Sequence, residues 1–289
     1  MRARSTTAQV FGALAFGALL SAAPAAAASP ALQVGPAVRV GLGTAPQVAV
    51  FADGAFVVVW SGHSASGAAT LHARLFDRAG APKSGEIELL RPAGQVLDGV
   101  AALPNGFVAV WEQANGHGLG SVLARVWNRR GAPLTAPFKV HADSPYDRCC
   151  AQVAAGPGSG FTVAWSSAIG GPRDRGYTSI VDRRPFDAAG RPLGPEPVDP
   201  PVDNSTPYPF ELDQNFPLGL TVDSEGRAAS VDLDEADDWT VDLVRGGGTV
   251  RLEPTPDFVA QYEVTASLQP GGDLALAWAT GEPGYTFPA

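Results

Sequence analysis

The densest group of acidic side chains in this chain lies near residue 235. Several carboxylate oxygens together are what a calcium ion requires. The spacing differs from the twelve-residue calcium loop, which places acidic residues at alternate positions, a glycine sixth and a glutamate last. A solvated acidic loop is therefore the favoured interpretation, and calcium is the only cofactor that the sequence suggests, through Asp232, Asp234, Asp237 and Asp238.

The chain contains two cysteines, Cys149 and Cys150, and they are adjacent. In an oxidising compartment, neighbouring thiols can form a disulfide with each other, although the small ring is constrained relative to ordinary bridges. Reduced thiols, or a bond to another chain, are the alternatives. We predict the intrachain disulfide, which would stiffen its own loop rather than link distant parts of the fold.

A loop in the middle of the chain combines charged and aromatic side chains that could bind a polar ligand. These side chains belong to Arg173, Asp174, Arg175 and Tyr177. A solvated loop is the alternative for any one of them, because exposed loops are generally polar. The histidines at 63, 117 and 141 lack the regular spacing of a zinc site.

Tryptophan and arginine recur at fixed positions, which suggests a structural role. Each tryptophan ends a short apolar segment, so we expect it to pack between structural units rather than to form a sugar-stacking surface. The arginines lie two residues before an aromatic residue, where a guanidinium can stack on a ring. The tryptophans are Trp60, Trp111, Trp165 and Trp278, and the arginines are Arg74, Arg125 and Arg184.

These residues belong to a repeat with a period of about fifty residues. Residues 55–82 (AFVVVWSGHSASGAATLHARLFDRAGAP) are followed by a copy at 106–133 and a looser one at 160–192. Apolar segments of four to six residues bounded by turn residues indicate buried strands. A period of this length is typical of a β-propeller or another repeat array. A bent β-sandwich is the alternative, but it does not predict the period.

The prediction is therefore an all-β propeller, with five four-stranded blades in a single domain at 29–289. The last unit is too short for four strands, whereas a segment at 34–40 (VGPAVRV) resembles the fourth strand of unit two. We expect this segment to pair with residues 282–288 and close the ring, since closure removes exposed edges. The units lie at 46–90, 97–140, 150–198, 216–253 and 262–289 together with 34–40.

The first 28 residues have the form of a secretory signal peptide. Two arginines precede a short apolar segment and a run of small residues, and this segment is too short to span a membrane. Its removal would leave 18 basic against 29 acidic residues. We expect an exported protein, periplasmic or extracellular, with no membrane span. Nucleic acid is an unlikely partner because it requires clustered basic residues.

The repeated residues also resemble a known family. The strand at 56–60 followed by ARLFDRAGAP, with its copies, is similar to repeats of exported bacterial proteins of unknown role, which have the form F-V-V-x-W and R-x-F-D-x-x-G-x-P. The resemblance covers units one to three better than units four and five. It implies a secreted propeller, and that family carries no catalytic motif.

The predicted blades separate scaffold from candidate binding surface. One side carries short repeated turns, and the other carries unequal loops at 61–69, 112–120, 146–150 and 166–177, where binding is expected. A glycan-acting hydrolase would need paired carboxylates on the innermost strands. The strands predicted at 46–51, 100–103, 152–155 and 218–222 contain none, and only Glu263 begins one. A non-catalytic module binding a glycan or a protein is therefore preferred, with the hydrolase as the alternative.

Overall fold

The computed structural model describes residues 38–91, 96–114, 120–143, 147–170, 177–197, 216–222, 228–233, 239–244, 248–252, 264–268 and 274–278. The chain divides into two compact units, Met1–Arg39 and Val40–Ala289, and every described regular element lies in the second. All of these elements are strands, so the predicted all-β class is confirmed for this part of the chain. Within the same ranges no helix has the length and apolar character needed to cross a membrane.

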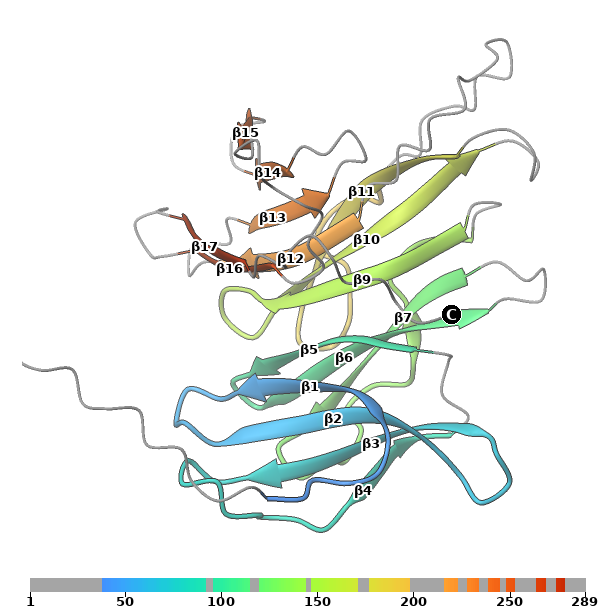
Figure 1. The fold of residues 1–289 in the computed structure, drawn as a ribbon, viewed down its shortest axis with the longest axis vertical. Coiled ribbons are helices and arrows are strands. Elements are labelled where there is room, and N and C mark those ends of the chain that lie inside the picture. Colours follow the sequence, from blue (N-terminus) through green and yellow to red (C-terminus); the bar gives the residue numbers. More distant parts are fainter. Residues whose placement is uncertain are drawn as a thin grey trace, which may run out of the picture. The chain divides into compact units, whose positions relative to one another are not determined.

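Seventeen strands are described, and they form five sheets of antiparallel strands that are consecutive in the chain (Figure 1). Sheet 1 contains β1 (Thr44–Val50), β2 (Phe56–His63), β3 (Ala69–Phe76) and β4 (Ile87–Leu90). Sheet 2 contains β5 (Val96–Leu103), β6 (Gly106–Ala114), β7 (Gly120–Asn128) and β8 (Phe138–Lys139). Sheet 3 contains β9 (Asp147–Ala155), β10 (Phe161–Gly170) and β11 (Tyr177–Phe186).

The two remaining sheets follow the same order. Sheet 4 contains β12 (Phe216–Val222), β13 (Ala228–Leu233), β14 (Trp239–Val244) and β15 (Gly248–Leu252). Sheet 5 contains β16 (Val264–Leu268) and β17 (Leu274–Trp278). Consecutive antiparallel sheets of this kind are what a chain of repeats predicts, because each repeat forms one meander.

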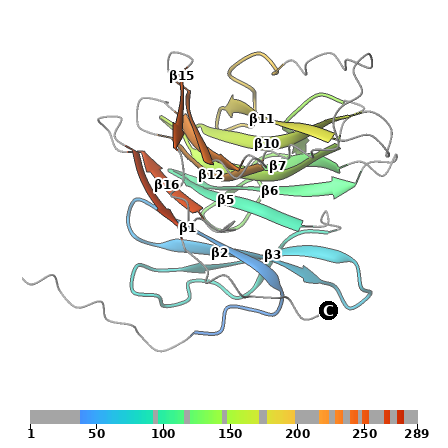
Figure 2. The same ribbon diagram turned by 45° about the horizontal axis from the view of Figure 1, so that its top comes forward.

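The sheets meet along their first strands. β1 contacts β5, β5 contacts β9, β9 contacts β12, and β12 contacts β16 (Figures 1 and 2). This is the contact pattern of neighbouring propeller blades. Closure into a ring stays a prediction: residues 38–40 of the expected closing segment form no strand, and 282–288 lie outside the described residues.

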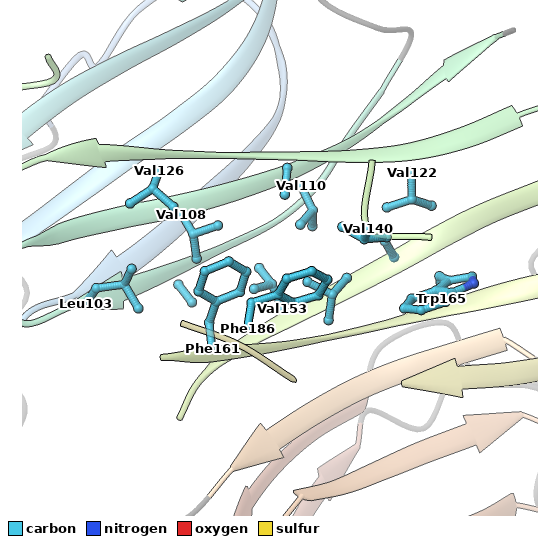
Figure 3. Packing of buried hydrophobic residues seen from close by; sticks show 14 residues of the cluster. Leu103, Val108, Val110, Val122, Val126, Val140, Val153, Phe161, Trp165 and Phe186 are labelled. Atoms are coloured by element: carbon cyan, nitrogen blue, oxygen red, sulfur yellow. The ribbon is translucent and has the colours of Figure 1, made fainter. Parts of the chain in front are cut away.

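The core lies between neighbouring sheets. In β6, Phe107 and Trp111 pack toward sheet 1, whereas Val108 and Val110 pack toward sheet 3. Figure 3 shows Val108 and Val110 near the rings of Phe161 and Phe186. A central strand with both faces buried has no polar face, which explains the continuous apolar segments in the sequence.

Three of the four recurring tryptophans are buried and the three arginines are stacked as expected, whereas the side chain of Trp278 lies outside the described part of the chain. Trp60, Trp111 and Trp165 are at most 3% exposed, and Trp165 packs in the cluster shared by sheets 2 and 3. Three arginines lie over the aromatic ring two residues later, with 5.7 to 5.9 Å between the guanidinium carbon and the ring centre. These pairs are Arg74 with Phe76, Arg125 with Trp127, and Arg184 with Phe186.

The short turns at one end of the sheets repeat almost atom for atom. Oδ1 of Asn128 accepts hydrogen bonds from the N–H groups of Arg130 and Ala132. Oδ1 of Asp77 and of Asp187 each accepts the same two bonds. A glycine three residues after each has a φ of 74 to 81°, which side chains disfavour. We call this end of the sheets, which also carries the hairpin at 51–55, the turn end.

Candidate functional site

Four first strands carry a β-bulge near their start, at the end opposite to the turn end; we call it the bulge end. The bulges lie between Thr44 and Gln47 in β1, Leu97 and Gly99 in β5, Cys149 and Gln152 in β9, and Pro217 and Gly219 in β12. A bulge adds a residue to one strand and re-aims its side chains. The bulge end is therefore where the repeated frame presents side chains that differ between sheets.

The bulge of β5 presents a carboxyl group. Asp98 is the extra residue, and its side chain accepts a hydrogen bond from the N–H of Ala151 in the neighbouring β9. The two strands come close because residue 99 is a glycine; a Cβ there would lie 3.3 Å from Cγ1 of Val153. The side chain of Asp98 thus connects sheet 2 to sheet 3.

The environment of Asp98 favours its protonated form. Burial of the carboxyl group raises its pKa to about 8, and the negative charge of Glu112 acts in the same direction. The N–H of Ala151 works against this shift because it stabilises the charged form. The Oδ2 atom of Asp98 is buried and has no hydrogen-bond partner in the described ranges, which makes its ionisation costly.

The second carboxyl group comes from the adjacent strand. Glu112 follows Trp111 in β6 and lies opposite Val96 of β5, beside the bulge. Its Oε1 accepts a hydrogen bond of 2.7 Å from the N–H of Cys150. Asp98 and Glu112 therefore accept hydrogen bonds from two consecutive N–H groups of β9, those of Ala151 and Cys150.

These N–H groups belong to the bulge of β9, which also contains the disulfide. Cys150 and Ala151 together lie opposite Trp165, and Cys150 has a φ of 61°. The Sγ atoms of Cys149 and Cys150 are bonded, so the predicted vicinal disulfide is present. Side chains of neighbouring residues in a regular strand point to opposite faces. The bulge brings both sulfur atoms to one side.

The disulfide and the carboxyl pair form one half-buried cluster at the bulge end. One ligand atom from each of Glu112, Cys149 and Cys150 lies within 4.8 Å of the others. Sulfur atoms bonded to each other are not thiolates, so the oxidised cluster offers a metal ion only carboxylate oxygens. Its chemistry in this form is proton exchange and hydrogen bonding.

The absence of acidic residues on the innermost strands was a wrong prediction. β5 begins at Val96 rather than at residue 100, so it includes Asp98. β9 begins at Asp147 rather than at 152, and the exposed carboxylate of Asp147 accepts a hydrogen bond from the N–H of Gly120. The bulges interrupt the apolar alternation that marks a strand, so the sequence pattern starts each strand only after its bulge.

Most of the residues predicted to bind a ligand or calcium lie outside the described part of the chain. Arg173, Asp174 and Arg175 lie outside the described residues, and Tyr177 begins β11, where it pairs with Gly170. Asp232 lies within β13, opposite Pro217, rather than in a loop. Asp234, Asp237 and Asp238 lie outside the described residues, so the calcium prediction is neither supported nor contradicted.

The two described histidines of this set, His63 and His141, have different environments. His63 ends β2 and is exposed, whereas His141 is buried beside Trp165. Burial lowers the pKa of His141 to about 4, and its Nε2 accepts a hydrogen bond of 3.0 Å from the N–H of Val122. His141 is therefore a neutral core residue, and residue 117 lies outside the described ranges.

Comparison with solved structures shows a similarity of fold. An ulvan lyase, a polysaccharide lyase, matches with a TM-score of 0.50 at 13% identity, over 76% of this chain and 60% of the lyase. A thermostable family-43 glycoside hydrolase matches with a TM-score of 0.48 at 10% identity, over 81% of this chain and 82% of the hydrolase. The chain thus spans about 60% of the length of the lyase. No family model matches the chain, and no curated protein matches its sequence.

Proposed function

We propose that this protein is a propeller-like module that binds a glycan at the bulge end. The observation that carries the proposal is the half-buried pair of Asp98 and Glu112, held beside the disulfide where three strands of two sheets meet. Neighbouring carboxyl groups can hydrogen-bond two hydroxyls of one sugar ring, and a protonated Asp98 adds a donor that two carboxylates lack. The disulfide offers an apolar surface next to them.

Glycan hydrolysis is the second candidate, and the raised pKa of Asp98 favours it. A carboxyl group that keeps its proton near pH 7 can act as a general acid toward a glycosidic oxygen, with a charged carboxylate beside it. Asp98 lies on an innermost strand, where a glycan hydrolase requires an acidic residue. The same two carboxyl groups also accept hydrogen bonds from N–H groups of β9. This structural role accounts for their presence without catalysis.

One experiment separates the two functions. The chain and its Asp98→Asn and Glu112→Gln variants would be applied to a glycan panel, with bound sugar and released reducing ends measured in parallel. Asp77→Asn at the turn end is the matched control, because it changes an equivalent carboxyl group outside the cluster. Binding that the control retains and both cluster variants lose supports the proposal. Product release lost in both cluster variants, by about 10²-fold or more, supports hydrolysis.

Two outcomes of this experiment would contradict the proposed site. Glycan binding that survives both cluster substitutions would overturn the site assignment. Binding lost in Asp77→Asn, with folding intact, would move the site to the turn end.

We further propose that the five sheets close into a ring in which sheet 5 covers the free face of sheet 1. Val48 and Val50 of β1 are 57% and 63% exposed. Their register equivalents in sheet 2, Val100 and Ala102, are partly buried against the cluster of sheets 1 and 2. In the described part of the chain, this face of β1 is therefore less covered than the equivalent face of β5.

The position of Val40 supports closure by the residues before it. Val40 packs beside Trp60 and Phe76 of sheet 1, and its carbonyl oxygen accepts a hydrogen bond from Arg74. Val140 has the same role on sheet 3, where its carbonyl oxygen accepts a hydrogen bond from Arg184. Val140 follows the fourth strand of the preceding sheet. By equivalence, residues 34–39 would form the fourth strand of sheet 5.

Polar substitutions on the exposed face of β1 test whether the ring is closed. If sheet 5 covers this face, replacing Val48 and Val50 together with serine should cost well over 1 kcal/mol, because buried apolar area is lost. Leu193→Ser, at a residue that is 64% exposed near a turn, is the control and should change stability by less than about 0.5 kcal/mol. Equal small effects from both changes would contradict closure.

Export to the periplasm or outside the cell, with residues 1–28 as a signal peptide, remains part of the proposal. It is supported by the disulfide, because disulfides persist in oxidising compartments. The similarity to a polysaccharide lyase concerns the fold, and a glycan ligand is compatible with it. Additional contacts from the 171–176 loop and a calcium ion near residue 235 are proposed on sequence grounds.

A further inference from the structure

We propose that Cys149, Cys150 and Glu112 form a binding site for a soft divalent cation, such as Zn²⁺ or Cd²⁺, once the disulfide is reduced. Two thiolates and one carboxylate would then bind the ion, and water would complete a four-coordinate shell. This site shares Glu112 and both cysteines with the proposed glycan site, but the inference does not depend on glycan binding, because it requires neither a sugar nor catalysis.

The three side chains are already close enough. Their ligand atoms lie within 4.8 Å of one another, and they come from β6 and β9 in neighbouring sheets. Ligand atoms of a tetrahedral zinc ion are roughly 3 to 4 Å apart, so small side-chain movements suffice. All three residues are half-buried, so an ion can reach them from solvent and still be partly shielded.

The backbone that places both sulfur atoms on one side does not depend on the bond between them. Cys150 has a φ of 61°, and its register equivalent in the bulge of β1, Ala45, has a φ of 48° without any disulfide. The N–H of Cys150 is also held by Glu112, and that of Ala151 by Asp98. We therefore expect the bulge to persist after reduction, with both thiols beside the carboxylate.

The reaction that opens the site is thiol–disulfide exchange with a dithiol reductant. One reductant thiolate attacks a sulfur of the bridge and forms a mixed disulfide, and the second reductant thiol resolves it. The protein gains two electrons and two protons, while the reductant becomes a disulfide. Binding of the cation then releases the two thiol protons, because thiolates are the ligands.

The chain has only two cysteines, so reduction affects a single disulfide. The oxidised protein, the reduced protein after anaerobic removal of reductant, and the Cys149→Ser/Cys150→Ser variant would be titrated with Cd²⁺ alone. Ultraviolet cadmium–thiolate absorption reports ligation, and competition with a chromophoric chelator gives the affinity. Circular dichroism of each sample reports folding.

We expect one equivalent of Cd²⁺ per reduced chain, with no thiolate band in the oxidised or serine forms. Glu112→Gln should weaken binding about tenfold or more. Glu86→Gln changes a glutamate just before β4 that pairs with His72, and it should leave binding unchanged. Equal affinity in the reduced protein and its Glu112→Gln variant would overturn the proposed ligand set. A reduced protein that does not bind the ion, or that unfolds, would overturn the claim that the bulge holds the thiols in place.

Discussion

The two ends of the sheets are built on opposite principles. At the turn end, Asp77, Asn128 and Asp187 make the same two hydrogen bonds in three sheets. At the bulge end, equivalent positions carry different residues: Ala45 and Pro46 in β1, Asp98 in β5, and Cys150 and Ala151 in β9. Sheets with the same topology require the same turns, so the turn residues repeat. Residue types differ between sheets at the bulges, where the fold does not require a particular side chain. Function is therefore expected at the bulge end.

The two ends also differ in their electrostatics. The N–H of Arg191 lowers the pKa of Asp187 below its usual 3.8, because a turn that donates to a carboxylate stabilises the charged form. Burial raises the pKa of Asp98 to about 8. A carboxylate at the turn end stabilises backbone, and a carboxyl group at the bulge end holds a proton.

The largest loss of stability is expected for a substitution in the core opposite the bulge of β9. Trp165 is fully buried opposite the bulge of β9, and Trp165→Ala should lower the free energy of unfolding by about 3 to 5 kcal/mol because it leaves a large cavity. Trp165→Phe should cost less. Urea unfolding measures both. If Trp165→Ala kept its stability and lost only ligand binding, the tryptophans would belong to the site rather than to the frame.

A smaller effect is expected at the turn end. Asn128→Ala removes the acceptor for two backbone N–H groups, and the unfolding free energy should fall by about 1 to 2 kcal/mol. Asn128→Asp is the matched control, because aspartate occupies this position at residues 77 and 187; it should change stability by less than about 0.5 kcal/mol. Thermal unfolding of both variants measures this difference. Equal stability of Asn128→Ala and the unchanged chain would mean that the two hydrogen bonds in this exposed turn do not stabilise the fold. Glycan binding should be unaffected in either.

The regular part of this architecture could be predicted from the sequence. The repeat, the buried segments ending in Trp60, Trp111 and Trp165, and the turns that combine Asp or Asn with a glycine all depend on residues close together in the chain. Each has a local physical cause, such as alternation, burial or positive φ. The adjacency of the two cysteines was likewise sufficient to predict their bond.

The candidate site could be predicted only in part, because its contacts are not local. Asp98 precedes a glycine inside a bulge and therefore has the pattern of a turn, and Glu112 has the pattern of a loop after Trp111. Their partners in β9 lie 38 or more residues away in the chain. The register between two sheets was needed to bring these residues together.

A gradual change in stability is expected when the pH is varied. The folded chain keeps a proton on Asp98 up to about pH 8, whereas the unfolded chain releases it near 3.8. The unfolded state thus binds fewer protons between these values, so stability should fall as pH rises, by up to about 1.4 kcal/mol per pH unit. His141, with its pKa lowered from 6.5 to about 4, acts oppositely: stability is lost as pH falls through that window.

The two slopes therefore oppose each other below about pH 6.5, and a net decline should appear between 6.5 and 8. Urea unfolding at several pH values measures it, and Asp98→Asn should abolish it. A wild-type chain with constant stability from pH 6.5 to 8 would contradict a buried proton on Asp98.

The contrast between the two ends is tested most directly by titrating their carboxyl groups in one sample. Carbon-13 NMR of aspartate side chains, assigned with Asp98→Asn and Asp187→Asn variants, would follow both groups from pH 2 to 9. We predict that Asp98 titrates near 8, that Glu112→Gln lowers this value, and that Asp187 titrates below 3.8. An Asp98 that titrates near 3.8, like an exposed aspartate, would contradict a proton-holding carboxyl pair at the bulge end.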